Sequence, residues 1–182
     1  MDVTRLYTNI PQEEGIDIVC IAYDNFLKSN PPIPTKYLRE MLRLILKENS
    51  FQFNERHYLQ THGTAVGTKT AVSFANIFMA KMETEILSKV FSKPTDWKRY
   101  IDDVFSLWDM SKPDIEIFID QANLHHPTIK FTAEISDTET ETGSSKVKRY
   151  ESLEQTPPRI LSRKTFRNLK DICGTEVTHA IW

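Results

Sequence analysis

Two adjacent carboxylates, Asp102 and Asp103, stand between two apolar segments in the run DWKRYIDDVFSLW. Like charges side by side repel each other, so the plainest interpretation is a turn that faces water. A tetrapeptide of aromatic, aliphatic, Asp and Asp nevertheless arises by chance in only about 1% of chains of this size. A tight hairpin turn would bring both side chains to the end of a sheet, where they could face a common metal ion.

A third carboxylate, Asp2, begins the segment DVTRLYTNI. The apolar residues Val3, Leu6 and Ile10 predict a strand that turns into a helix near position 11. If this strand lies beside the 98–108 hairpin, Asp2 and Asp102 come together. Such carboxylates suit Mg²⁺, which completes its octahedron with water and substrate phosphates. Two ions about 3.5 to 4 Å apart would activate a hydroxyl and stabilise a leaving pyrophosphate.

The composition places few limits on function. The chain has 182 residues, 40% of them apolar and 26% charged, which fits one globular domain with a sizeable core. A net charge of -2 neither indicates nor excludes a nucleic-acid partner. No apolar stretch approaches the roughly 20 residues of a membrane span, so no membrane partner is expected. Cys20 and Cys173 have no CxxC neighbours, which favours a reduced intracellular setting and leaves nucleus and cytoplasm equally open.

Hydrophobic periodicity predicts helices that alternate with short strands. Helical spacing occurs at 11–29, 37–46, 72–91 and 112–124. The pairs 50–54 with 56–60 and 97–101 with 104–108 predict hairpins, and 128–135 predicts a half-buried strand. With the leading strand, this order predicts an α+β fold in which an antiparallel sheet has helices on one face.

Residues 137–182 differ in composition from the rest of the chain. They are rich in Thr, Ser, Glu, Lys and Pro and have little apolar periodicity. This composition predicts a divergent, flexible tail that does not join the core. The sequence therefore divides into a folded part, 1–136, and this tail.

Three segments, in this order, resemble the successive palm motifs of reverse transcriptases: DVTRLYTNIPQEEG, GTAVGTKTAVSFANIFM and WKRYIDDVF. They are most similar to those of Penelope-like retroelements, and HHPTIKFTAEIS resembles the segment that follows there. The resemblance covers about residues 1–136, and three ordered motifs are far more specific than any one of them. It implies a polymerase palm, with a ferredoxin-like antiparallel sheet and helices on one face, and the activity of an RNA-directed DNA polymerase.

The resemblance assigns the three carboxylates. Asp2 and Asp102 match the two catalytic carboxylates, and Asp103 is the adjacent acid of the YIDD turn. All three are the implied ligands of two Mg²⁺ or Mn²⁺ ions. The implied reaction is nucleotidyl transfer onto a primer 3′-hydroxyl, and the implied partners are an RNA template, a DNA primer and a deoxynucleoside triphosphate (dNTP).

Four further residues are candidates for binding the nucleotide. Tyr7 matches the aromatic residue that lies beneath the nucleotide sugar and crowds out a 2′-hydroxyl. Gly63 and Gly67 match a loop whose backbone approaches template and nucleotide. Lys69 stands near the start of the following helix, where it could meet a phosphate or be one more solvated lysine.

Three more cations could contact the substrates. Lys98 and Arg99 could steady the primer backbone, since phosphate contacts position a nucleic acid without reading its sequence. Lys130 lies where polymerases often keep a lysine that protonates the leaving pyrophosphate, although solvation at a strand edge explains it equally well.

The chain departs from the family pattern at both ends. The fingers that precede the palm, and the primer grip and thumb that follow it, are largely missing, so the resemblance implies a truncated polymerase. Thr70 and Val72 stand where the family usually has methionine and proline. The alternative is a catalytically inactive retroelement relic, at most a nucleic-acid-binding module. A third possibility is a plain α+β domain with a solvated turn, or a metal-dependent phosphohydrolase, although no histidine lies near the acids.

Overall fold

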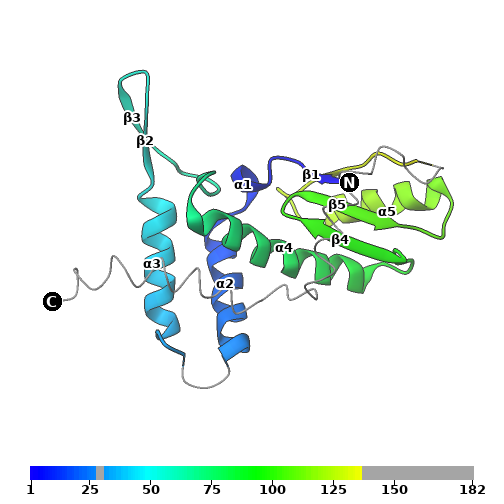
Figure 1. The fold of residues 1–182 in the computed structure, drawn as a ribbon, viewed down its shortest axis with the longest axis horizontal. Coiled ribbons are helices and arrows are strands. Elements are labelled where there is room, and N and C mark those ends of the chain that lie inside the picture. Colours follow the sequence, from blue (N-terminus) through cyan, green and yellow to red (C-terminus); the bar gives the residue numbers. More distant parts are fainter. Residues whose placement is uncertain (28–30, 137–182) are drawn as a thin grey trace. The chain divides into compact units, whose positions relative to one another are not determined.

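The protein, in a computed structural model, is described for residues 1–27 and 31–136. These residues form two compact units, 1–6 with 82–136 and 7–81 (Figure 1). Both contain helices and antiparallel strands, which confirms the α+β prediction. The predicted tail, 137–182, lies outside the described residues.

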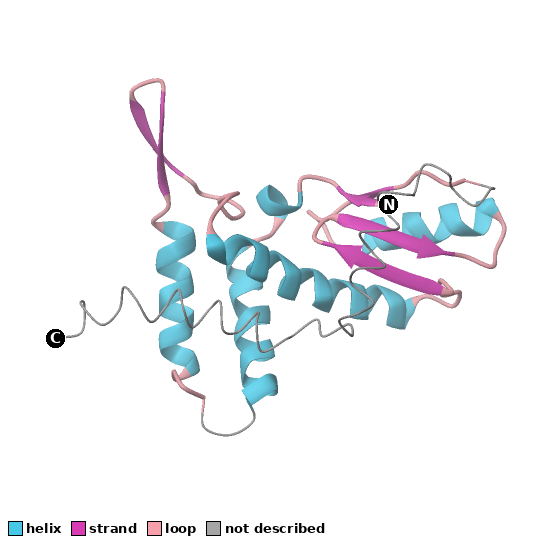
Figure 2. Ribbon diagram, in the orientation of Figure 1, coloured by secondary structure: helices cyan, strands magenta, loops and turns pink. Residues whose placement is uncertain are grey.

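The first unit is built on a four-stranded antiparallel sheet (Figure 2). Its strands are β1 (Asp2–Val3), β4 (Asp96–Tyr100), β5 (Asp103–Leu107) and β6 (Phe131–Thr132), in the order β4-β5-β1-β6. The hairpin β4–β5 is the one predicted around the two aspartates. The first strand of the chain is therefore an inner strand, bonded to β5 on one side and β6 on the other.

The two faces of this sheet differ because successive residues of a strand point to opposite sides. One face is buried by α5 (Lys112–His125) and by the C-terminal end of α4 (Lys69–Lys89). The ring of Trp97, on this face, lies edge-on to Phe118 of α5 with ring centroids 6.0 Å apart. The buried strand residues of this face are Val3, Val104 and Phe131. The other face carries Asp2, Tyr100 and Thr132, which are exposed.

A buried ion pair joins α4 to the sheet. Glu83 Oε1 accepts hydrogen bonds from Trp97 Nε1 at 2.9 Å and from Arg99 Nε at 2.8 Å. The side chains of Glu83 and Arg99 are each only 8% exposed. Burying such charges is costly unless they pair, so each side chain needs the other to remain in this core.

A second set of polar contacts ends α5 and leads the chain into β6. His126 Nδ1 accepts the backbone N–H groups of Thr128 and Ile129, both at 3.2 Å. Lys130 Nζ donates to the carbonyl oxygens of His126, at 3.0 Å, and of Asn123, at 2.5 Å. A cation at a helix C-terminus is favourable because the last carbonyl groups lack partners within the helix. Lys130 is thus engaged in ending α5.

The second unit is mainly helical. It contains most of α1 (Leu6–Asn9), then α2 (Gln12–Leu27), α3 (Thr35–Lys47), the hairpin β2 (Ser50–Phe53) and β3 (Arg56–Leu59), and the first part of α4. Helices α2 and α3 lie side by side (Figure 1). An added Cβ at Gly15 of α2 would lie 2.3 Å from Cζ of Phe74, so only glycine lets the Phe74 ring of α4 pack this closely.

Ion pairs at the surface also link α2 to α3. Arg43 donates to Glu13 at 2.8 Å, and Lys47 pairs with the same carboxylate. The hydrogen bond from Arg43, followed by that from Lys47, lowers the pKa of Glu13 to about 2. These side chains are about half exposed, so water and salt screen the attraction. Burial of apolar side chains on the two helices, such as Val19 and Leu42, therefore contributes more to stability than these ion pairs.

Three predicted boundaries were wrong. The N-terminal strand contains only Asp2 and Val3, and Leu6 already lies in α1, because residues four apart such as Leu6 and Ile10 also fit a helical period. The strand predicted at 128–135 is reduced to β6. Helix α4 spans 69–89 instead of 72–91, since Thr68 Oγ1 accepts the N–H of Ala71 at 3.2 Å and so caps its first turn.

The buried pair gives a direct stability test. Replacing Glu83 with alanine leaves Arg99 buried without its carboxylate, so we expect the free energy of unfolding to fall by about 3 kcal/mol or more. Urea denaturation followed by circular dichroism measures this loss. The matched control is Glu116→Ala, which removes an exposed glutamate of α5 and should change stability by less than about 0.5 kcal/mol. Equal effects of the two substitutions would contradict the assignment.

Candidate active site

Asp2 and Asp103 lie directly opposite each other on neighbouring strands. The hydrogen bonds that flank them run from Val3 N to the Asp102 carbonyl, at 2.9 Å, and from Val104 N to the Met1 carbonyl, at 2.8 Å. The pair is therefore of the non-hydrogen-bonded kind, in which side chains approach most closely, with Cβ atoms about 4.5 to 5.5 Å apart. Two like charges so placed repel each other, and a cation would relieve this repulsion.

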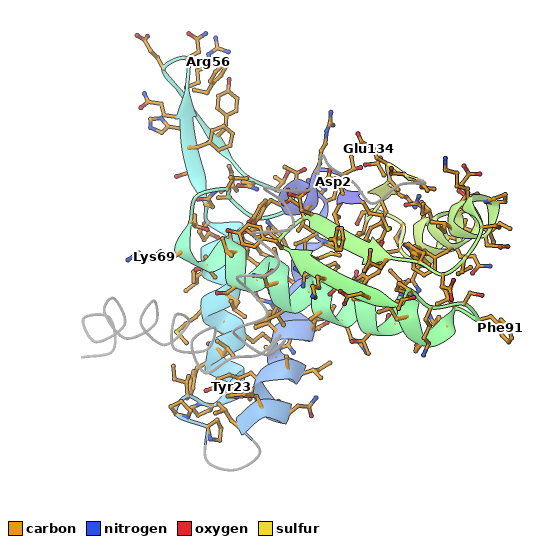
Figure 3. All side chains as sticks on the ribbon, turned by 45° about the vertical axis from the view of Figure 1, so that its right-hand side comes forward. Asp2, Tyr23, Arg56, Lys69, Phe91 and Glu134 are labelled. Atoms are coloured by element: carbon orange, nitrogen blue, oxygen red, sulfur yellow. The ribbon has the colours of Figure 1, made fainter. Side chains whose placement is uncertain are left out.

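This pair belongs to a row of residues across the open face of the sheet. Tyr100 of β4 lies opposite Asp103, and Thr132 of β6 lies opposite Asp2. Asp2, Tyr100 and Thr132 are exposed and Asp103 is half-buried. Figure 3 shows the labelled Asp2 on β1. Both carboxylates therefore keep some exposure to solvent on this face of the sheet.

Asp102 lies in the two-residue turn between β4 and β5, next to Ile101. Ile101 has a φ of 59°, a left-handed conformation that is a genuine outlier for a β-branched residue. Such a conformation costs about 1 to 3 kcal/mol and persists only where the surrounding structure imposes it. Residues of this kind cluster at functional sites, and here the strained residue immediately precedes the two aspartates.

Arg99 helps to impose this turn. Its Nη1 donates to the Ile101 carbonyl at 2.9 Å while its Nε is held by Glu83. Arg99 is therefore a positioning residue for the acidic turn. The prediction that Arg99 steadies a primer was wrong, because its side chain is buried and engaged on the helical side of the sheet.

Glu83 is the site-supporting residue that sequence reasoning missed. It stands four residues after Met79 and three before Ile86, both buried, and so falls on the apolar stripe of α4. A glutamate on such a stripe predicts a buried partner, and this signal was present in the sequence. Its partner Arg99 could not be identified from the sequence, because the two residues belong to different elements.

The carboxylates do not form a complete metal cage. Within residues 1–27 and 31–136, no group of three or more His, Cys, Asp or Glu side chains is arranged to hold a metal ion. Asp2 was predicted to meet Asp102, but the sheet register places Asp2 opposite Asp103. Asp102 is the residue before Asp103 and lies in the turn. Mg²⁺ is often bound in this way, by one or two carboxylates with water and substrate phosphates completing its shell.

Two of the predicted nucleotide-binding residues contact each other in the second unit. The backbone N–H of Thr64 donates to the Tyr7 carbonyl at 2.7 Å, which ties the loop to α1. Gly63 is buried and has a φ of +65°, and an added Cβ would lie 2.3 Å from the Tyr7 carbonyl oxygen and 2.6 Å from the Thr8 Cα. Gly63 therefore serves a close approach within the protein and supports the backbone of Tyr7.

Gly67 and Lys69 lie further along the same segment. Gly67 is exposed, has a φ of +94°, and an added Cβ there would meet no atom within 4 Å. Its surroundings leave room for a ligand to approach the backbone. Lys69 is the first residue of α4, whose first turn carries no acidic side chain, and it points outward (Figure 3). The helix N-terminus adds to the positive potential there.

Comparison with known families, characterised proteins and solved structures found no match to this chain. The roles that the resemblance to reverse transcriptases gives to Asp2, Asp102, Asp103 and Tyr7 therefore stay predictions, as does the phosphate contact of Lys69.

The helices were also compared with the requirements of a membrane span. In the described part of the chain, no helix combines the length and the apolar character that crossing a bilayer requires.

The two loop glycines provide a matched pair of substitutions. Both have positive φ, so alanine costs backbone strain of about 1 kcal/mol at each. Gly63→Ala also forces a Cβ against the backbone of Tyr7 and Thr8, which cannot move aside as a side-chain end can. We expect Gly63→Ala to lower the free energy of unfolding by at least about 2 kcal/mol more than Gly67→Ala. Urea denaturation of both variants measures the difference, and equal losses would contradict the close approach at Gly63.

Proposed function

We propose that this chain is the palm of a retroelement reverse transcriptase, an RNA-directed DNA polymerase, whose metal site is formed by Asp2, Asp102 and Asp103. The observation that carries the proposal is the direct opposition of Asp2 and Asp103 on the open face of the sheet, next to a strained turn. Like charges directly opposite each other destabilise a sheet, and a bound cation would offset this repulsion.

The order of elements in the first unit supports the palm. Its strands follow the chain as strand, helix, hairpin, helix, strand, and the spatial order is β4-β5-β1-β6. This is the connectivity of the ferredoxin-like split β-α-β fold. Fold alone does not imply function, so the carboxylate pair has to carry the assignment.

The residues of the chain have separate parts in this proposal. Asp2 and Asp103, with Asp102 beside them, would bind two Mg²⁺ or Mn²⁺ ions, which supply a lowered pKa for the attacking primer hydroxyl and charge for the leaving pyrophosphate. Arg99 and Glu83 hold the acidic turn in place. Tyr7 would discriminate against a ribose 2′-hydroxyl by steric contact, and Lys69 would meet a phosphate of the dNTP or template. The partners are an RNA template, a DNA primer and a dNTP.

An inactive descendant that binds nucleic acid without turnover is the second candidate. It is favoured by the incomplete cage, since the described residues hold no group of three side chains arranged around an ion. The two candidates differ in what a divalent ion does. An active palm binds the ion at Asp2 and Asp103, whereas a binding module does not need an ion at this pair.

Metal binding can be tested without activity. In EDTA, Asp2→Asn removes the like-charge contact and should raise the free energy of unfolding by about 0.2 to 1 kcal/mol. With Mn²⁺ present, the melting temperature of the parent protein should rise while that of Asp2→Asn stays constant, because only the parent binds the ion. The matched control is Asp96→Asn, at the far end of the same sheet, which should keep the Mn²⁺ response. A parent protein that ignores Mn²⁺ would exclude this metal site.

Catalysis is tested by primer extension on an RNA template with Mg²⁺ or Mn²⁺. We expect incorporation of dNTPs by the purified protein. The double variant Asp102→Asn, Asp103→Asn should lose at least about a hundredfold in rate, because it would no longer hold the ions that stabilise charge on the attacking hydroxyl and the leaving pyrophosphate. Extension that persists unchanged in the double variant would rule out this site. Absence of both extension and the Mn²⁺ response would assign the chain to the second candidate.

A further inference from the structure

The hairpin β2–β3 has two chemically different faces. Its register places Phe51 opposite Tyr58 and Phe53 opposite Arg56, so these four residues share one face because residues two apart in a strand point the same way. The other face carries Ser50, Gln52, His57 and Leu59. One face of the hairpin is therefore aromatic with a single cation, and the other is mostly polar.

The aromatic face is open to solvent. Phe53 is 69% exposed, Phe51 50% and Tyr58 42%, although such side chains are commonly buried. The rings of Phe51 and Tyr58 stack with centroids 5.6 Å apart and an angle of 22° between their planes. A nearly parallel pair presents a broad, rigid apolar surface, to which Phe53 adds a third ring toward the tip.

The charge on this face is positive. Arg56 lies at the tip of the hairpin, far from α2 and α3 of the same unit (Figure 3). No hydrogen bond or ion pair with another described residue engages its guanidinium group, and none of the four residues of the face is acidic. The turn, Asn54 and Glu55, has positive φ values of 49° and 61°, which suit a tight hairpin turn that fixes this register.

A groove lies at the base of the hairpin. Phe51 of the aromatic face and Leu59 of the other face line it together with Thr8 and the loop residues His62 and Val66. The same loop contains Gly63 and leads to Gly67, the exposed glycine with room at its backbone. A ligand extended along the hairpin would therefore reach the loop that the proposed function assigns to the nucleotide and template.

We propose that the hairpin face formed by Phe51, Phe53, Arg56 and Tyr58 binds an unpaired stretch of nucleic acid, with bases stacked on the rings and a phosphate held by Arg56. Every base has a π-face, so stacking of this kind tolerates any sequence, and a nearby cation holds the backbone. Bases in a duplex are stacked on each other and cannot stack on these rings. The proposal extends the proposed function, but it needs neither the metal site nor a dNTP.

A second copy of the chain is the main competing occupant, since both edges of a two-stranded hairpin can pair with further strands. The face itself favours a polyanion. It contains three rings and one arginine, and none of its four residues is a carboxylate. Two such faces packed together would therefore bring two arginines close to each other without a counter-charge. Stacked bases between charged phosphates complement both the rings and the arginine.

The test is equilibrium binding of a fluorescein-labelled single-stranded oligonucleotide in EDTA, measured by fluorescence anisotropy. Phe53→Leu keeps an apolar side chain but removes the ring, and it should raise the dissociation constant at least about fivefold. Phe91→Leu, which changes another exposed phenylalanine, is the matched control and should leave the dissociation constant unchanged. Arg56→Gln should weaken binding and lower the salt dependence by about one ion, whereas Lys36→Gln should have no effect.

Further measurements separate this proposal from its competitors. A fully paired duplex of the same sequence should bind equally to the parent and to Phe53→Leu, and Asp2→Asn should bind the single strand normally, so the hairpin and the metal site can fail independently. Crosslinking of an oligonucleotide that contains 4-thiouracil should map to the hairpin. Equal affinity of Phe53→Leu and the parent for the single strand would overturn the proposal. Loss of dimerisation in Phe53→Leu, without loss of oligonucleotide binding, would also overturn it.

Discussion

The backbone pairing of β1 determines the candidate active site. Two hydrogen bonds, from Val3 to Asp102 and from Val104 to Met1, set the register that places Asp2 opposite Asp103. A shift of one residue would move Asp2 to the buried face and expose Val3, which is 1% exposed. The burial of Val3 and the opposition of the two carboxylates are therefore consequences of the same register, and the core holds the charges together.

This arrangement costs stability at two points, the opposed charges and the turn at Ile101. Strain of about 1 to 3 kcal/mol at a β-branched residue with positive φ has to be offset nearby. The pairing of β4 with β5 and the hydrogen bond from Arg99 to the Ile101 carbonyl supply this offset, and Glu83 keeps Arg99 in place. A catalytic site requires rigid support of this kind, because displacing its groups by about 1 Å is enough to lower the reaction rate.

Much of this fold could be predicted from the sequence, because local patterns determine it. The alternation of polar and apolar residues around Asn54 and around Asp102 predicted both hairpins, and helical periodicity predicted α2, α3 and α5. The boundaries of β1 and β6 could not be predicted, since each strand has only two residues and owes its conformation to its neighbours in the sheet. The pairing of Glu83 with Arg99 is likewise a tertiary contact, which no spacing along one element encodes.

The opposed pair Asp2 and Asp103 and the hairpin β2–β3 belong to different units. Each contains an arrangement that lowers the stability of the folded protein. Opposed carboxylates destabilise a sheet, and exposed rings do not contribute the hydrophobic free energy that their burial would give. The hairpin has few other sources of stability, because two strands with eight exposed residues are marginal in water. The Phe51–Tyr58 stack therefore has to stabilise the hairpin and also present the surface proposed to bind a nucleic acid. A ligand that stacks on Phe53 would bury a ring that the Phe51–Tyr58 stack leaves in water, so binding would also stabilise the hairpin.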